Sequence, residues 1–566
     1  MGPLEEQDLD SRRTVAEHDD GRGLPDDGRL GGLVQIRCHK AQCSRPLTRP
    51  TLEGVPLSRR HFLRASAAAV VLAPLAPSLA ACAAPEDVPK VEFGAKLPVP
   101  PLDAGTVDSA GGSPVRTFHL APQAGTHEFV AGKAADTMGY NGAYLGPTLR
   151  ASRGEKVRVV VENRLTEETT VHFHGVQLPA AADGGPHAMI AAGATASPEW
   201  TFDQPAATLW YHPHPHGNTE KQVGLGLAGL FLVDEAAPPS WGAATLPHEY
   251  GVDDIPLIVQ DRRLDSSGRI TFDPSGNSIG TLGNSIAANG VLGAVLPVTT
   301  QRVRLRILNA SAGRWFRFGF ADHRRFHMVA SDGGLLAAPL ELDAVQLSPA
   351  ERAEIVVEMA PGESVMLKSF APDLGRVNPA DAFGGGREFD VVRLDAATTL
   401  TPSAALPAAL AELAAPPDTR VATSRSFTFS GRQINGKTMD MNRIDFTAAP
   451  GGAEVWYVDN VNAFQHNLHI HGVQFRLLDI DGAAPPPERA GWKDTIPLMP
   501  RERNRLAFRM PRYADSQYPY MFHCHLLTHE DQGMMGQFVV ADGSAPAAAA
   551  GAAGSAGAGT GSQHAH

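Results

Sequence analysis

The sequence predicts an all-β protein built from several sandwiches or barrels, and three observations lead to this fold class. The 57 glycines and 45 prolines favour a chain of many turns and strands over a helix bundle. Short strand-like runs recur between clusters of Gly, Pro, Asn and Asp. The length of 566 residues corresponds, at roughly 100–200 residues per domain, to about three or four domains.

Three segments illustrate the strand pattern. In the run E-K-V-R-V-V-V-E-N, Val157, Val159 and Val161 occupy alternate positions, which predicts a strand with one apolar face. Residues 302–309, R-V-R-L-R-I-L-N, alternate basic with apolar side chains and predict a half-buried strand. Residues 353–359, A-E-I-V-V-E-M, predict another strand.

Changes in composition divide the body of the chain. Boundaries are expected near 236–250 and at a linker over 396–420, which has the composition of a short helix before its double proline. Residues 542–566 form an Ala/Gly/Ser tail that is expected to be disordered.

An export signal precedes the body. Residues 58–64, S-R-R-H-F-L-R, form a twin-arginine pattern. Residues 65–81 carry no charge, are short for a membrane span and contain Pro74 and Pro77. We therefore expect residues 58–82 to be a twin-arginine signal peptide that sends the protein to the periplasm or the outer cell surface.

The end of this signal leaves two alternatives open. Residues 79–82, L-A-A-C, resemble a lipobox, which would make Cys82 a lipidated N-terminus, whereas a plain signal would leave Cys82 incidental. Residues 1–57 precede the signal and are expected to form a disordered extension. Misassignment of the start codon is the other explanation for them.

Charge and cysteine content exclude some classes of function. The net charge of −12, with no basic run in the body, argues against nucleic acid as a partner. Cys38, Cys43 and Cys82 lie in or before the signal, so Cys524 is the single cysteine of the body. A disulfide framework is therefore excluded, and Cys524 is a candidate ligand or nucleophile.

The most specific motif is residues 521–535, M-F-H-C-H-L-L-T-H-E-D-Q-G-M-M. A thiolate, an imidazole and a thioether within about a dozen residues form the ligand set of a blue-copper electron-transfer centre. The candidates are Cys524, His529 and Met534, with Met535 as an alternative axial ligand. For either methionine, core filler is the competing interpretation.

Four pairs of histidines predict a second metal centre. The chain has 22 histidines and six H-x-H pairs, where chance predicts about one. The patterned pairs are His172/His174, His212/His214, His469/His471 and His523/His525. Residues i and i+2 of a strand share a face, so each pair offers two imidazoles to one cavity. Any one pair alone is more typical of a core, but eight imidazoles predict a cluster of two or three metal ions.

Strand geometry divides these ligands between the two centres. Cys524 and the histidines on either side of it would point to opposite faces of a strand, and so toward different metals. His466 lies three residues before His469, can leave the face used by the pair, and can complete the site at Cys524.

This division predicts an oxidase. An outer copper takes single electrons from a reductant, and a buried cluster delivers four electrons to one dioxygen, which yields two waters. Such a cluster needs proton donors, and Asp183 and Glu530 are the candidates. The competing interpretations are a turn-forming aspartate and a solvated glutamate.

Together these segments resemble the signature of the multicopper oxidases, which include laccases, bilirubin oxidases and bacterial copper-efflux oxidases, from about residue 113 to 541. The segments most similar to the copper-efflux branch are N-G-A-Y-L-G-P-T-L-R at 141–150, S-D-G-G-L-L at 331–336, M-D-M-N-R-I-D-F at 439–446 and R-A-G-W-K-D-T at 489–495.

The resemblance implies three cupredoxin-like Greek-key domains, at 113–236, 250–395 and 421–541, with a trinuclear cluster between the first and third. It also implies four coppers per chain: one type 1, one type 2 and two type 3. By motif position the type 2 copper would take His172 and His469. One type 3 copper would take His174, His212 and His525, and the other His214, His471 and His523. His187 and His216 match no ligand position.

Two departures from the copper-efflux branch bear on the substrate. That branch carries a methionine-rich insertion over the blue copper, whereas residues 370–425 contain no methionine, which predicts a more open substrate face. It also has Asp and Met where this chain has Asn462 and Phe464. Both changes favour phenols or aromatic amines, for which Phe464 would supply an apolar wall.

Several hypotheses compete. The leading one is a laccase-like oxidase, and the second is a cuprous oxidase for copper tolerance. A third is a non-catalytic copper-binding or envelope scaffold protein, although such relatives typically lose the ligands that are all present in this chain. The expected partners are dioxygen and a small aromatic reductant or cuprous ion, with no nucleic acid, and with a membrane only through a lipid anchor on Cys82.

Overall fold

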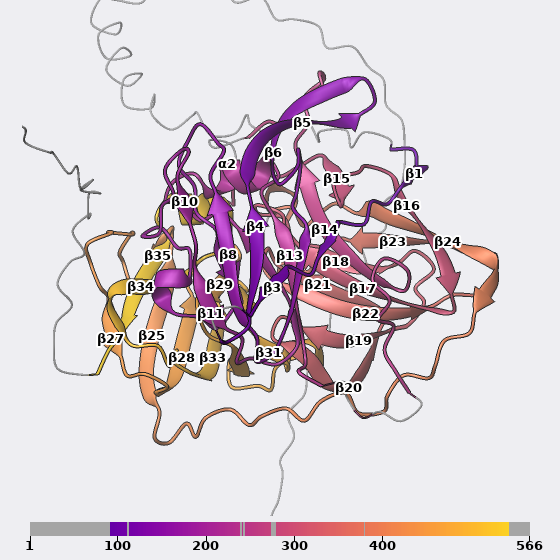
Figure 1. Cartoon of the computed structure of the whole chain (residues 1–566). Coiled ribbons are helices and arrows are strands. Elements are labelled where there is room, and N and C mark those ends of the chain that lie inside the picture. The colour runs from indigo at the N-terminus through magenta and orange to yellow at the C-terminus, as the bar shows by residue number, and fades with distance from the viewer. Residues whose placement is uncertain are drawn as a thin grey trace, which may run out of the picture. The chain divides into compact units, whose positions relative to one another are not determined.

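The computed structural model describes residues 91–109, 112–237, 240, 244–272, 279–377 and 380–542. The predicted extension, the signal peptide with Cys82, and the tail beyond residue 542 lie outside the described residues. Most regular elements are strands, which confirms the all-β prediction, and they form three sandwiches (Figure 1). None of the helices in the described part has both the length and the apolar character that crossing a membrane requires.

The first sandwich contains two five-stranded sheets and a hairpin. One sheet holds β10 (Thr195–Ala196), β8 (Lys156–Glu162), β4 (Val115–Leu120) and β3 (Thr106–Asp108), with β11 (Glu199–Thr201) paired to β8. The other runs β2 (Leu102–Asp103), β7 (Thr148–Ser152), β13 (Gly229–Asp234), β12 (Ala207–His212) and β9 (His172–His174). The hairpin is β5 (Pro122–Val130) and β6 (Lys133–Tyr140). Val157, Val159 and Val161 are buried between the sheets, as the alternation predicts.

The second sandwich contains two six-stranded sheets. One runs β1 (Ala95–Lys96), β16 (Ala294–Thr300), β24 (Phe389–Thr401), β23 (Ser364–Phe370), β18 (Phe316–Phe320) and β21 (Ala344–Leu347). The other runs β15 (Ser285–Ala288), β14 (Asp254–Arg262), β17 (Arg302–Asn309), β22 (Arg352–Glu358), β19 (Phe326–Ser331) and β20 (Gly334–Leu342). Strands β17 and β22 lie where residues 302–309 and 353–359 predict them.

The half-buried character predicted for residues 302–309 is wrong. Arg304 and Arg306 are only 8% and 6% exposed, although they alternate with the apolar core positions. Arg306 Nη1 donates to Thr208 Oγ1 of the first sandwich and to Glu354 Oε1, so the outer face of β17 is covered by a neighbouring sandwich. Buried carboxylates pair with both arginines, and this pairing lets the charges leave water.

The third sandwich carries the C-terminal motif. One sheet runs β26 (Gln433–Ile434), β25 (Thr423–Ser430), β28 (Ala453–Asn460), β33 (Arg503–Arg509), β30 (Phe475–Ile480) and β31 (Trp492–Lys493). The other runs β27 (Phe446–Ala448), β35 (Met535–Val540), β34 (Asp515–His523), β29 (His466–Ile470) and β32 (Thr495–Leu498). The core between them contains the fully buried Trp456, Phe522 and Cys524.

The helix considered for the predicted linker does not form. Residues 396–401 extend strand β24, and residues 402–420 contain no helix. Pro402 and Pro407 lack the backbone N–H that a helix interior needs, and the alanine runs between prolines are too short to hold a helix alone.

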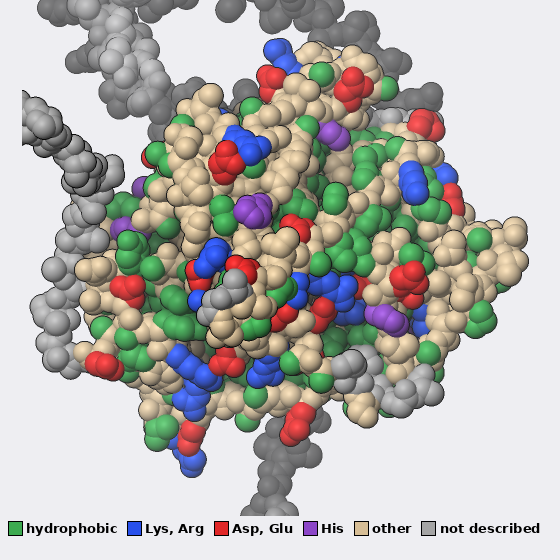
Figure 2. Space-filling model, viewed as in Figure 1, with side chains coloured by type: hydrophobic (Ala, Val, Ile, Leu, Met, Phe, Trp, Pro, Cys, Tyr) green, Lys and Arg blue, Asp and Glu red, His purple; other side chains and the backbone are tan. Residues whose placement is uncertain are grey.

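The few helices are short. The 3-10 helices are η1 (Ala180–Ala182), η2 (Ala380–Phe383) and η3 (Pro487–Arg489), and the α-helices are α2 (Thr219–Gly224) and α3 (Leu527–Asp531). The Asp531 carboxylate accepts hydrogen bonds from the Thr219 and Glu220 backbone N–H groups, so α3 of the third sandwich docks on α2 of the first. On the face drawn in Figure 2, acidic and basic side chains are interspersed.

Candidate metal centres

The eight paired histidines come together in one buried cluster. None of their side chains is more than 1% exposed. They come from the ends of β9 and β12 in the first sandwich and of β29 and β34 in the third. Only the pair on β9 lies wholly within a strand. In the other pairs the second histidine follows the strand end, and Pro213 explains one such end because it has no N–H for the ladder.

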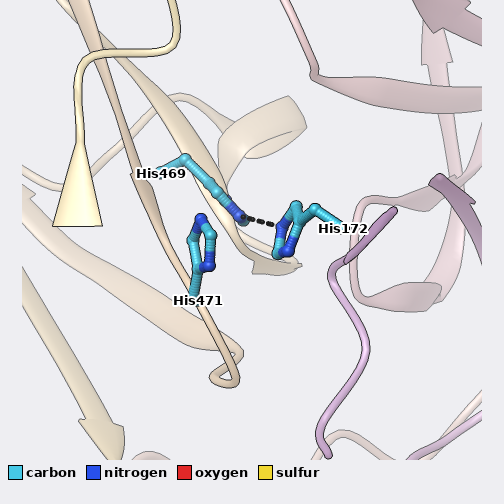
Figure 3. A group of neighbouring side chains, drawn as sticks. All are labelled: His172, His469 and His471. Atoms are coloured by element: carbon cyan, nitrogen blue, oxygen red, sulfur yellow. Dashed lines mark hydrogen bonds between the residues drawn. The ribbon is translucent and has the colours of Figure 1, made fainter. Parts of the chain in front are cut away.

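One contact of the cluster joins the two sandwiches directly. His172 Nε2 and His469 Nε2 are 3.4 Å apart. Figure 3 shows these two rings meeting tip to tip, with His471 beside them on the segment that carries His469. The ring of His471 stacks on that of His172 at a centroid distance of 3.8 Å.

The other histidines form two further groups. His212 Nε2 lies 3.4 Å from both His174 Nδ1 and His525 Nε2. In the second group His523 Nε2 lies 3.2 Å from the Nε2 atoms of His214 and His471. The structure thus brings together the same sets that the resemblance implies, and it places His523 and His525 in different groups.

The second nitrogen of most rings already has an acceptor. His172 Nδ1 donates to the Asp183 backbone oxygen and His471 Nδ1 to Asp183 Oδ2, at 2.8 and 2.6 Å. His469 Nδ1 donates to the Asp494 backbone oxygen at 2.8 Å and His212 Nδ1 to the Pro213 oxygen at 2.9 Å. Since a neutral imidazole carries one N–H, the nitrogens that face one another inside the cluster present lone pairs.

This arrangement fits metal ions. Facing lone pairs repel unless a cation lies between them, and burial holds the pKa values of these histidines below the usual range, so the rings are neutral. Two imidazole nitrogens bound at about 2.0–2.1 Å to one tetrahedral cation lie roughly 3.3 Å apart, as estimated from zinc sites. The separations of 3.2–3.4 Å in the structure match this value.

A separate group forms on the other side of the strand end. His466 Nδ1 lies 3.4 Å and His529 Nδ1 3.5 Å from Cys524 Sγ. His466 opens β29 and His469 follows three residues later, so the two side chains leave on opposite faces, as predicted. Burial raises the pKa of the Cys524 thiol to about 12, so the thiolate needs a cation nearby.

The position of the two methionines differs. Met534 belongs to the same buried cluster as Cys524, and the Cys524 N–H donates to the Met534 backbone oxygen at 3.1 Å. Met535 lies on β35 and pairs with His523 of β34, so its side chain lies on the same face as His523 and points away from Cys524. The structure therefore favours Met534 as the thioether beside Cys524.

The surroundings of His466 are more closed than the sequence predicts. His466 is fully buried, and the ring of Phe464 lies 5.0 Å from it. Phe383 of η2 stacks on Phe464 at 5.8 Å, and the Gln465 side chain donates to the Phe383 oxygen. The segment that lacks the methionine-rich insertion thus still supplies a cover. Asn462 Nδ2 lies 2.8 Å from His466 Nε2.

Both predicted proton donors lie at the cluster. Asp183 is 1% exposed, contacts His471 through Oδ2, and has no hydrogen bond at Oδ1, which lies 3.6 Å from His172 Nδ1. Glu530 is also 1% exposed, and its two oxygens lie 3.3 Å from His214 Nδ1 and His523 Nδ1. Burial raises the pKa of each carboxyl well above its usual range, which favours the protonated form.

Sequence reasoning missed several residues that contact the site, and Asp494 is the charged one that binds a cluster histidine directly. Asp494 Oδ1 accepts from His174 Nε2 at 3.0 Å, and its carboxylate is bound by Arg352 of the second sandwich. The motif R-A-G-W-K-D-T contained this aspartate, but no spacing rule linked it to a histidine more than 300 residues away. His187 and His216 belong to neither centre, and His187 instead contacts Gln537.

Comparisons with known proteins agree with this geometry. Three family models described as multicopper oxidase match residues 122–238, 262–374 and 413–544. The multicopper oxidase mco of Staphylococcus haemolyticus is 34% identical over 437 residues, which are 75% of this chain and 89% of that protein. The cell division protein FtsP of Escherichia coli K12 is 35% identical over 495 residues, which are 86% and 99% of the two chains.

Solved structures are similar as well. A laccase from Pediococcus acidilactici superposes with a TM-score of 0.71 at 33% identity, covering 81% of this chain and 95% of that one. The laccase-like multi-copper oxidase CueO from Ochrobactrum sp. gives a TM-score of 0.71 at 37% identity, covering 78% and 100%. These neighbours confirm the predicted cupredoxin-like fold class.

Proposed function

Because the chain belongs to the multicopper oxidase family, we propose that it couples one-electron oxidation of phenols or aromatic amines to four-electron reduction of dioxygen to water. The observation that carries this proposal is that two buried ligand groups of different chemistry lie next to each other. One contains Cys524 with His466 and His529, and the other contains only imidazoles. Family membership by itself supports copper-dependent oxidase activity.

The residues divide the cofactor between two centres. His466, Cys524, His529 and Met534 would hold one copper, and the eight paired histidines would hold three, which makes four per chain. Bound copper would supply one-electron chemistry at the sulfur site and multi-electron reduction of dioxygen at the imidazole cluster.

The chain itself supplies the connection between the centres. Cys524 follows His523 and precedes His525 directly, so one peptide unit on each side joins the cysteine to the histidine group that contains His523 and to the group that contains His525. Electrons that enter at Cys524 therefore have a short covalent route to the dioxygen site.

Asp183 and Glu530 are proposed as proton donors. Both carboxyls are buried beside cluster histidines and are held in the protonated form by the lack of water around them. Each would give a proton as negative charge develops on the dioxygen that is being reduced. This is general acid catalysis by a group with a raised pKa.

The substrate class rests on the cover of His466. Phe464 and Phe383 present stacked aromatic rings that suit an aromatic reductant, and Asn462 carries no charge to attract a cation. The Ochrobactrum oxidase, 37% identical to this chain, is described as active on lignin model compounds and lignosulfonate, which supports an aromatic substrate. Cuprous ion is the alternative reductant.

Localisation is a separate proposal. We propose export by the twin-arginine route to the periplasm or outer cell surface, with Cys82 as a lipid anchor in one of the two alternatives. Neither nucleic acid nor any further membrane contact is part of the proposed function.

The deciding experiment compares reductants. Oxygen uptake by the copper-loaded chain is measured with a methoxyphenol and with cuprous ion, and the phenol is expected to give the higher kcat/KM. Asn462→Asp adds a negative charge next to His466 and is expected to shift the preference toward cuprous ion. A strong preference of the unaltered chain for cuprous ion would overturn the aromatic substrate.

A role in cell division is the second candidate, because FtsP proteins match 86% of this chain at 35% identity. The test is complementation of a strain that lacks its FtsP, with the unaltered chain and with Cys524→Ser. Equal rescue by both, together with no oxygen uptake by the purified unaltered chain, would favour the non-catalytic role.

A further inference from the structure

Arg352 lies at the centre of a buried polar network. It is fully buried at the start of β22. Its Nε donates to the Thr208 oxygen, and Nη1 and Nη2 donate to the Ala350 and Asp332 oxygens, at 3.0–3.1 Å. The same two nitrogens bind Asp494 Oδ1 and Oδ2 at 2.7 and 2.6 Å. All five N–H groups of the guanidinium thus have acceptors.

These acceptors come from all three sandwiches. Thr208 lies on β12 of the first, Ala350 and Asp332 belong to the second, and Asp494 lies in the third, directly before β32. The second sandwich supplies none of the predicted metal ligands, yet its Arg352 side chain binds Asp494, which contacts two histidines of the cluster.

Asp494, which Arg352 holds in place, accepts hydrogen bonds from two histidines of the cluster. Its Oδ1 accepts the proton of His174 Nε2 at 3.0 Å, and its backbone oxygen accepts that of His469 Nδ1 at 2.8 Å. With the proton held on Nε2, His174 Nδ1 carries the lone pair, and this is the atom that faces His212 Nε2 at 3.4 Å.

We propose that Arg352 is a positioning residue of the histidine cluster. Arg352 binds both oxygens of Asp494 and so fixes this residue in place. Asp494 in turn sets the tautomer of His174 and the orientation of His469. The cluster can therefore bind its metals properly only when the second sandwich is docked. This inference rests on the proposed copper-binding function. It gives the second sandwich a function at a site to which it contributes no ligand.

The alternative is that Arg352 only stabilises the fold. It belongs to a buried group that also contains Lys493, Asp332 and Glu351, with ion pairs of 2.9 Å from Lys493 to each acid. Breaking any such buried pair destabilises a protein. The test therefore needs a readout that loss of stability alone does not change.

Arg352→Lys is the informative variant, because lysine keeps the charge but offers three donors at one point in place of a planar fork. Arg314→Lys is the matched control. Arg314 is also buried and pairs with a carboxylate, Asp261, at 2.9 Å, but its side chain donates to Asp261 and Gly283, which both lie in the second sandwich. Both variants are expected to lower the melting temperature.

The readouts are copper per chain, copper affinity of the cluster in a chelator competition, and the paramagnetic spectrum of the copper-loaded protein. For Arg352→Lys we expect cluster affinity about 10–100-fold lower and a changed cluster spectrum, with the blue absorption kept. Arg314→Lys should leave all three unchanged. Asp494→Asn provides a second variant, because an amide must turn an NH2 group toward either Arg352 or His174.

Each outcome either supports or overturns the role proposed for Arg352. If Arg352→Lys and Asp494→Asn both show the affinity and cluster spectrum of the unaltered chain, Arg352 is structural only and the inference is overturned while the proposed function stands. The same conclusion follows if Arg314→Lys changes the cluster as much as Arg352→Lys. An unaltered chain that binds no copper would overturn the proposed function and this inference together.

Discussion

Replacing Cys524 with serine tests the proposed route of electrons most directly. The side chain is fully buried, and its sulfur lies 3.4–3.6 Å from His466 Nδ1, His529 Nδ1 and Asn467 Oδ1. Serine conserves the shape but replaces a soft thiolate ligand with a weakly bound hydroxyl. The variant should lose the copper at this site and keep the cluster, none of whose ligands it alters.

The expected cost to the fold is small compared with the expected loss of function. A buried hydroxyl with imperfect hydrogen bonds costs about 1–3 kcal/mol, whereas domains are stable by roughly 5–15 kcal/mol. The chain should therefore fold with three coppers in place of four. Mutation of residues that only support metal ligands lowers activity by up to about 100-fold. Loss of the electron entry site itself should therefore lower the rate of phenol oxidation by at least this factor.

Three measurements on one preparation check this prediction. Metal analysis should give three coppers per chain, the visible spectrum should lack the intense blue band, and oxygen uptake with a methoxyphenol should be lost. Circular dichroism should confirm the β fold. A folded, three-copper variant that still oxidises the phenol at near the original rate would refute the route through Cys524.

Five further variants extend the test to other parts of the molecule. Asp183→Asn and Glu530→Gln remove the buried proton donors and should each slow oxygen uptake by about 100-fold or more, without changing copper content. Met534→Leu should keep the blue colour and raise the reduction potential in a redox titration, because the weak axial ligand is lost, whereas Met535→Leu should not. Glu354→Gln should destabilise the chain by about 3–5 kcal/mol at pH 7 in denaturant unfolding, because it leaves two buried arginines short of a partner.

The last variant also has a pH signature. Burial alone would raise the pKa of Glu354, but Arg304 and Arg306 lower it to about 2. A depressed pKa adds stability that is present above the ordinary pKa, near 4.5, and is lost as the pH falls toward 2. The difference in stability between the unaltered chain and Glu354→Gln should therefore shrink across this window. A constant difference from pH 7 to 3 would contradict the assignment.

Sequence patterns predicted much of the candidate site because its ligands obey local rules. The H-x-H spacing, the H-C-H tripeptide and the offset between His466 and His469 each follow from side-chain alternation on a strand. The structure gathers these residues as predicted, although most pairs straddle a strand end. The alternation rule was less useful for Arg304 and Arg306, since it cannot say whether the second face of a sheet meets water or another sandwich.

The sequence by itself determined the all-β class and the chemical identity of both ligand groups, because periodicity and residue type are local properties of the chain. Only the tertiary structure decided which distant segments meet. The contact of Asp494 with His174, the grip of Arg352 on that aspartate and the closure of Phe383 over Phe464 depend on how the sandwiches and loops pack. Such contacts join residues far apart in the chain, where no spacing rule applies.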